Sequence, residues 1–257
     1  MEVYKQKEKV RLLVFVALAA CIAMWLVKPI PQDPRYHTFA DERGYFSIPN
    51  FWNVISNVPY FVFGAMGIFF LLRERKNNLF TQNYWAYQTF FIGAFLISFG
   101  SAYYHAWPDN DTLVWDRLPM TVAFMGFFAV IVGEFIDSRW GKILLLPLIG
   151  LGILSVSYWI YTEHQGYGDL RLYAVVQYLP MILLPLIVIM FKKKGQHLKY
   201  LWLMMLAYLI AKFFEAGDFV LFEKTPFLSG HTLKHFAASC APLFFLMYLK
   251  ERTRVGV

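Results

Sequence analysis

Cysteine is almost absent from this chain. Only two occur among the 257 residues, and both Cys21 and Cys240 lie within apolar stretches. A stapled fold needs several cysteines at telling spacings, so the sequence excludes a disulfide framework. It also lacks internal repeats and low-complexity segments, which indicates one continuous domain rather than an array of units.

Alternation of apolar and polar residues, which membrane-spanning strands show, is also missing. The chain is 58% hydrophobic and contains 26 Phe. Several apolar runs are about as long as the ~20 residues that a spanning helix needs. They predict an all-α integral membrane protein rather than one or two soluble domains. The eight expected spans are 12–27, 52–72, 84–104, 118–136, 143–161, 172–191, 198–221 and 231–249.

The net charge of +7 does not indicate a nucleic-acid partner, because the basic residues are distributed by loop. With eight spans, all the basic clusters fall on one membrane face. The positive-inside rule then places both termini in the cytoplasm, and the compact loops without a eukaryotic targeting signal favour a bacterial inner membrane. The clusters are Lys5, Lys7, Lys9 and Arg11; Arg73, Arg75 and Lys76; Arg139 and Lys142; Lys192, Lys193, Lys194 and Lys199; and Lys250, Arg252 and Arg254.

The N-terminal part reads as an addition to a larger core. We expect an accessory transmembrane helix at 1–28, an extracytoplasmic loop rich in proline at 29–51, a seven-helix catalytic domain at 52–250 and a cytoplasmic tail at 251–257. The basic start and Leu18-Ala-Ala-Cys21 also suit a lipoprotein signal. However, the apolar run continues to Val27, beyond the usual signal core of roughly 7–15 residues, so an uncleaved span is favoured over processing at Cys21.

Three histidines at the ends of apolar runs form the most informative pattern. His231 and His235 are four residues apart, so they share one helical face. His105 ends the third span, and eight-span topology brings it to the same membrane face. Three imidazoles leave the fourth place of tetrahedral Zn²⁺ open for a catalytic water. Polar groups at membrane depth are costly, which itself suggests a function.

Ser101 and Asp116 are the candidate catalytic residues beside these histidines. Ser101 lies four residues before His105 and so shares its face, although a serine in a membrane helix commonly bonds back to its own carbonyls. Asp116 is expected at the start of the fourth span, where a carboxylate also suits the helix dipole. Asp109 and Asp111 are interpreted as solvated loop residues.

The remaining polar residues are weaker candidates. His197 is expected on the cytoplasmic face, and His37 and His164 lack partners at a telling spacing. The aromatic residues near the site suit either a lipid entry or an interfacial belt; they are Tyr103, Tyr104, Trp107 and Trp115. A charged triplet near the outer end of the seventh span suits a buried network, a supporting role or outward snorkelling; it is Lys212, Glu215 and Asp218.

Taken together, these motifs resemble the alkaline ceramidases and their wider superfamily of membrane hydrolases, which includes the adiponectin-receptor-like proteins. The resemblance spans roughly 41–249. It rests on Ile48-Pro-Asn-Phe-Trp-Asn-Val-Ile-Ser-Asn57, Gly100-Ser-Ala-Tyr-Tyr-His105, Asp116-Arg-Leu-Pro-Met120 and Gly230-His-Thr-Leu-Lys-His235. It implies a seven-helix core, zinc on His105, His231 and His235, and Ser101 and Asp116 beside the metal.

Two features depart from the family pattern. The first span makes eight helices rather than seven. Eukaryotic members also hold calcium through an acidic N-terminal loop and a glutamate, whereas Asn50 stands at that glutamate position here. The usual calcium ligands are therefore not retained, and the remnants that would form a Ca²⁺ site are Asp41, Glu42 and Asn50.

The resemblance implies a zinc-dependent hydrolase that releases a fatty acid from a ceramide-like lipid amide. Asp116 would orient or deprotonate the attacking water, and the Ser101 hydroxyl would stabilise the oxyanion or hold the water. The alternatives are a receptor-like or lipid-binding protein with structural zinc, a hydrolase of another acyl-lipid linkage, and a haem-binding redox protein.

Overall fold

The computed structural model describes residues 2–192 and 198–255 of the chain. Helices make up most of these residues and no strand occurs among them, which confirms the predicted all-α class. Lys193, Lys194 and His197 lie outside the described residues. The elements in chain order are α1 (Glu2–Leu26), η1 (Pro34–His37), α2 (Phe51–Ile55), α3 (Val58–Arg73), α4 (Asn78–Thr81), α5 (Tyr84–Ala106), α6 (Asn110–Ile131), η2 (Val132–Ile136), α7 (Ser138–His164), α8 (Arg171–Phe191), α9 (Lys199–Ala216), α10 (Asp218–Lys224) and α11 (Gly230–Val255).

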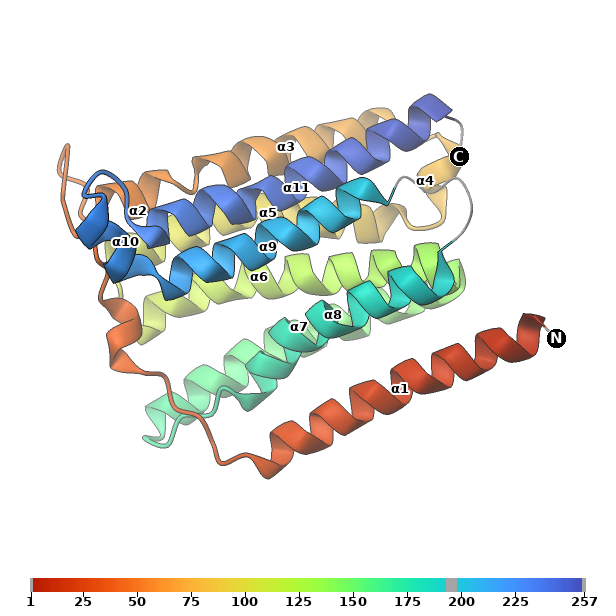
Figure 1. Cartoon of the computed structure of the whole chain (residues 1–257), viewed down its shortest axis with the longest axis horizontal. Coiled ribbons are helices and arrows are strands. Elements are labelled where there is room, and N and C mark those ends of the chain that lie inside the picture. The colour runs from red at the N-terminus through yellow and green to blue at the C-terminus, as the bar shows by residue number, and fades with distance from the viewer. Residues whose placement is uncertain (1, 193–197, 256–257) are drawn as a thin grey trace.

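The long helices run side by side, with α6 near the centre (Figure 1). Within the described residues, six candidate spans are long and apolar enough to cross a membrane, which identifies a multi-pass membrane protein. Helices α5 and α9 run alongside them but are not among these candidates, so the predicted total of eight spans stays a prediction. Both described ends of the chain lie at one end of the bundle, whereas α2 and α10 lie at the other.

Three expected spans differ from the helices observed. The segment 52–72 is interrupted between α2 and α3, and 198–221 is broken at Gly217, which separates α9 from α10. Helix α6 begins eight residues before the predicted start at 118, because Asp109 caps it: its carboxylate accepts from the backbone N–H of Thr112 at 2.6 Å. Asp116 is therefore inside α6 and is not a helix-start carboxylate, and Asp109 is a cap rather than a solvated loop residue.

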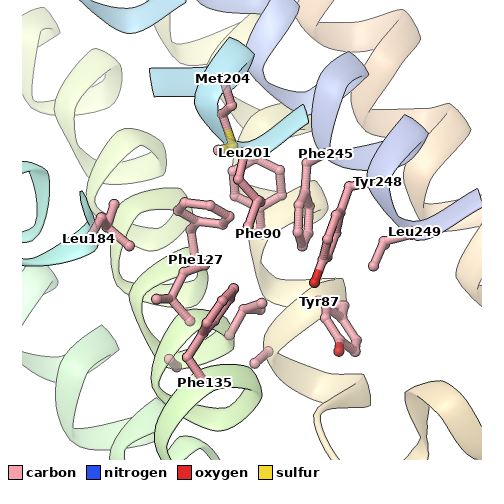
Figure 2. Packing of buried hydrophobic residues seen from close by; sticks show 14 of the residues in the cluster. Tyr87, Phe90, Phe127, Phe135, Leu184, Leu201, Met204, Phe245, Tyr248 and Leu249 are labelled. Atoms are coloured by element: carbon pink, nitrogen blue, oxygen red, sulfur yellow. The ribbon is translucent and has the colours of Figure 1, made fainter. Parts of the chain in front are cut away.

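Aromatic side chains fill the core between α5, α6 and α11 (Figure 2). The Phe245 ring lies 5.0 Å from that of Phe90 and 5.2 Å from that of Phe127, in edge-to-face contacts. Helices α8 and α9 add Leu184 and Leu201 to the same cluster. Lipid tails are as apolar as these side chains, so close van der Waals packing, rather than exclusion of water, stabilises helix association here.

A buried charge network closes this core near the chain ends. Glu134 in η2 accepts a hydrogen bond from the Tyr248 hydroxyl at 2.9 Å and others from Tyr87 and Arg252. A buried carboxylate is tolerated when a cation and further donors satisfy its oxygens. The network joins α5, η2 and α11 at the end of the bundle that lies away from the histidines.

Helix α1 lies at the edge of the bundle and packs against α8. Only 6% of its apolar window is buried, as suits a helix whose sides face lipid. Side chains secure it at both ends: Lys9 donates to the carbonyl of Met190, and Arg171 donates to that of Val27 at 2.8 Å. The predicted accessory helix is thus a peripheral helix that packs mainly against α8.

Helices α5 and α6 approach most closely beside the candidate catalytic residues. A Cβ atom placed on Gly100 would lie 1.9 Å from the carbonyl oxygen of Trp115, a distance that no side chain tolerates. Gly93, two turns earlier on α5, meets the Ala123 backbone in the same way. Glycine lets two backbones pack this closely, and the contact sets Ser101 opposite Asp116.

Replacing Gly100 with alanine should therefore separate α5 from α6 and lower the free energy of unfolding by about 1–3 kcal/mol, the usual cost of overpacking. Gly150→Ala is the matched control, because a Cβ at Gly150 meets nothing within 4 Å. Thermal unfolding of both variants in detergent measures the difference. Equal melting temperatures would show that the contact is not tight.

Candidate metal centre

The structure brings His105, His231 and His235 together. His105 ends α5, and the other two lie on the first two turns of α11. The Nε2 atom of His105 lies 3.1 Å from that of His235 and 3.3 Å from that of His231. Among the described residues, this is the group of histidine, cysteine or carboxylate side chains placed to hold a metal ion, with ligand atoms within 4.8 Å of one another. All three residues are buried.

Hydrogen bonds around His235 fix how its ring presents its lone pair. The Ser56 hydroxyl donates to the Asn53 carbonyl at 3.1 Å, so it accepts from Nδ1 of His235 at 2.7 Å. With the proton on Nδ1, the Nε2 lone pair points at the other two imidazoles. Converging nitrogen lone pairs in a buried site repel one another unless a cation lies between them, so this donor set fits a metal ion.

The other two rings are held differently. Phe39 packs edge-on against both His105 and His231, with ring centroids 4.9 and 4.6 Å away, and covers that side of the cluster. Nδ1 of His105 is buried with no hydrogen-bond partner among the described residues, so no protein acceptor fixes its tautomer. Position, rather than hydrogen bonding, therefore holds the His105 ring.

Backbone contacts anchor the start of α11, which carries two of the three histidines. Asp218 accepts from the backbone N–H of His231 at 2.7 Å and from that of Ala40 at 3.0 Å. The Asn53 side-chain oxygen accepts from the Thr232 hydroxyl at 3.0 Å. These contacts tie α10, α11, α2 and the N-terminal loop into one support for the metal cluster.

Sequence reasoning did not identify Ser56 and Asn53 as supporting residues. Both are fully buried, and both stand out in the sequence as polar residues within an apolar run. That signal was present, but nothing in the spacing says which histidine they contact. Asp218 was expected to belong to a charged network or to support the site, and it supports the site.

Ser101 and Asp116 lie together next to the histidines. The Ser101 hydroxyl lies beside the carboxyl group of Asp116, and both residues are buried. They line the same cavity as His235, so all three are accessible to one bound molecule. A hydroxyl, a carboxylate and an open metal cluster in one cavity are the components of a hydrolytic site.

The cavity has a volume of about 440 Å³. Helices α5, α6, α8, α9 and α11 form most of its wall, and the segment 30–36 after α1 closes another side. Gln32 joins this segment to two helices: its backbone N–H donates to Glu163 at 2.6 Å, and its side-chain oxygen accepts from Arg117 at 2.6 Å. The segment that follows the first helix thus completes the cavity wall.

The residues named as calcium remnants have other partners. Arg43 donates two hydrogen bonds to Asp41, from Nε at 2.8 Å and from a terminal nitrogen at 2.6 Å. The hydrogen bond with Asp41 raises the pKa of Arg43, so the arginine stays charged. Asn50 donates to the His105 carbonyl at 2.8 Å, and Glu42 is exposed. Arg43 therefore supplies at Asp41 the positive charge that a calcium ion would otherwise provide.

The other histidines, Asp109 and Asp111 lie away from the metal cluster, and Asp111 is in the first turn of α6 rather than in a loop as predicted. His37 contacts the Tyr104 hydroxyl at 3.1 Å and the Asn110 side chain at 3.0 Å. His164 pairs with Asp111 at 2.9 Å on the surface. Hydrogen bonds from Thr112 lower the pKa of Asp109, as befits a helix cap.

None of the four aromatic residues near the site lines the cavity. Tyr103, Trp107 and Trp115 are exposed, as an interfacial belt requires, whereas Tyr104 is buried against His105 at a ring distance of 4.8 Å. These positions favour the belt over the lipid entry for the three exposed residues.

Purified protein should carry about one divalent metal ion per chain, as a three-histidine site does. His231→Ala should lose most of it, because two imidazoles hold a metal far more weakly than three. His164→Ala is the control: this exposed histidine pairs with Asp111 and lies outside the cluster. Elemental analysis after gel filtration measures the content. Equal metal in both variants would contradict the assigned site.

Comparison with known proteins adds one finding to this geometry. The family model described as Ceramidase matches residues 45–219, which include Ser101, His105 and Asp116, but end before the two histidines of α11. No curated protein matches the chain. The family implies a membrane-embedded hydrolase that acts on amide bonds of lipids such as ceramide. Because the match covers more than half of the 257 residues, the chain belongs to the ceramidase family.

Proposed function

We propose that this protein is a zinc-dependent intramembrane amidase that releases a fatty acid from an N-acyl sphingoid-type lipid. The observation that carries the proposal is the shared cavity: Ser101, Asp116 and the metal-cluster residue His235 all line it. A substrate amide placed there would lie within reach of the metal position, a carboxylate and a hydroxyl at once. Family membership supports the same reaction.

Zinc is proposed on the chemistry of the donor set. Three neutral imidazole nitrogens suit Zn²⁺, and no fourth protein ligand appears among the described residues. Bound zinc would lower the pKa of a water molecule towards neutrality and polarise the amide carbonyl. The chain's own task is to hold three nitrogens in place, which Ser56, Asp218 and Phe39 support.

Asp116 is proposed as the general base. Its carboxylate lies in the same cavity as His235, and its oxygens can accept a proton from a water held there. The same carboxyl group then returns that proton to the departing amine nitrogen, so that the amine leaves neutral. Ser101 remains beside the reacting carbonyl, where its hydroxyl can stabilise the developing oxyanion.

The observations disfavour the competing functions. A purely structural zinc site is normally closed by a fourth protein ligand, whereas this cluster adjoins a cavity of about 440 Å³. Haem needs a flat slot between its axial ligands, but the three imidazole rings pack with centroids 4.6–5.0 Å apart. Hydrolysis of another acyl-lipid linkage would use the same residues, and a substrate panel separates it from amide hydrolysis.

We also propose the orientation in the membrane. Both chain ends and the helix ends that carry Arg73 and Arg139 are assigned to the cytoplasm, and the metal cluster to the extracytoplasmic face of a bacterial inner membrane. Support comes from the arrangement of the bundle: the described chain ends lie at the same end of it, opposite the end formed by α2 and α10 (Figure 1).

Asp116→Ala should lower kcat for fatty acid release by about 10²–10⁴-fold, the usual contribution of a general base. Asp111→Ala removes an exposed carboxylate from the same helix and serves as the control. Fatty acid release from a panel of N-acyl and O-acyl lipids measures both. Zinc-loaded protein that releases no fatty acid from any lipid in the panel would argue for a receptor-like role.

Calcium should not be required, because Arg43 already neutralises Asp41. Extensive dialysis against EGTA should leave fatty acid release unchanged, whereas dialysis against 1,10-phenanthroline should abolish it. Activity and residual metal are measured on the same samples. A loss of activity in EGTA that added Ca²⁺, but not Zn²⁺, restores would overturn this expectation.

A further inference from the structure

The cavity contains more positive side chains than hydrolysis needs. Arg117, Lys212 and Lys234 all line it together with the catalytic pair. The proposed mechanism uses none of them, although each is costly to place at membrane depth. Their joint presence at one cavity suggests that they bind something negatively charged.

Lys212 and Lys234 share one carboxylate. Lys212 contacts one oxygen of Glu215 at 2.5 Å, and Lys234 contacts the other at 2.9 Å. Each ammonium group has three donors, so both keep donors free of Glu215. The Lys212 side chain is 34% exposed, which leaves its end accessible at the cavity. This trio carries a net positive charge.

Arg117, on α6, adds a further positive charge to the net charge of this trio. Its guanidinium stacks on the Trp159 ring at 4.1 Å and lies 4.7 Å from that of Tyr173, and one nitrogen donates to Gln32. The other terminal nitrogen has no hydrogen-bond partner, and no carboxylate pairs with Arg117 within the described part of the chain. Aromatic faces stabilise a cation but do not neutralise it.

The cavity has fewer negative than positive groups. Glu215 is shared by two lysines and Asp116 is the other carboxylate beside them, so two carboxylates face the three cations Arg117, Lys212 and Lys234. Asp33, which also lines the cavity, forms a surface pair with Arg35 at 2.7 Å. Buried cations with too few counter-charges are stabilised when a ligand supplies the missing anion.

We propose that the substrate is an N-acyl lipid whose head group carries an anion, such as a carboxylate or a phosphate, bound between Lys212, Lys234 and Arg117. This inference rests on the proposed amide hydrolysis and names the substrate class for that site. A neutral head group offers only hydroxyl groups, which leave the excess positive charge without a counter-ion. An anionic head group satisfies them while the amide lies beside Asp116 and the histidines.

Paired substrates test this directly. N-palmitoyl-serine and N-palmitoyl-serinol share the acyl chain and the amide, and differ in a carboxylate against a hydroxymethyl group. N-palmitoyl-ethanolamine O-phosphate adds a phosphate arm. At least one anionic lipid should have a kcat/KM about tenfold or more above that of the serinol, as charge-assisted hydrogen bonds allow.

Lys212→Gln should reduce that ratio several-fold, because it removes one cation from the cavity. Lys224→Gln is the matched control: it removes the same charge from the exposed helix α10, near the same end of the bundle, and should keep the wild-type ratio. Equal kcat/KM for charged and neutral lipids would overturn the head-group inference and leave the amidase proposal standing.

Binding separates the two proposals if none of these lipids is cleaved. In the Asp116→Asn protein, quenching of intrinsic tryptophan fluorescence reports the affinity for each lipid without turnover. Tighter binding of an anionic lipid than of the serinol, weakened by Lys212→Gln, would support the head-group inference even if the amidase proposal fails. Equal affinities would overturn it.

Discussion

The close contact between α5 and α6 is the constraint on which the site depends. Glycines at positions 93 and 100 let the two backbones approach until Trp115 and Ala123 lie where side chains would otherwise be. This approach places Ser101 against Asp116, and it sets the end of α5 so that His105 meets the start of α11. The hydrophobic effect does not drive helices together inside a membrane. Close packing of this kind therefore largely determines where polar side chains meet.

A second constraint fixes the position of the metal cluster relative to α10, α2 and the loop after α1. Asp218 holds the first turn of α11 and the backbone of Ala40 at once, while Asn53 reaches both Thr232 and the Asp41 carbonyl. Each bond satisfies a polar group that would otherwise be buried without a partner. The histidines are thus fixed by a polar layer at the end of the bundle, and the aromatic core below it contributes rigidity.

Much of this arrangement could be predicted from the sequence. Long apolar runs predicted the all-α membrane fold, and helical spacing with loop polarity brought His105, His231 and His235 to one face. The helix break at Gly217 and the early start of α6 were missed, because continuous hydrophobicity hides breaks and a capping aspartate resembles a loop residue. Contacts such as Ser56 with His235 join residues far apart in the chain, and one sequence holds no record of such pairs.

The peripheral first helix has a consequence for how such a chain diversifies. Its following segment, 30–36, closes the cavity through Gln32, yet it contributes no metal ligand and no proposed catalytic group. One wall of the substrate chamber is therefore formed by a part of the chain that carries no reacting group. Substitutions in segment 30–36 would change which substrates fit the cavity without moving the three histidines of the metal cluster. The substrate range can therefore change during evolution while the reaction stays the same.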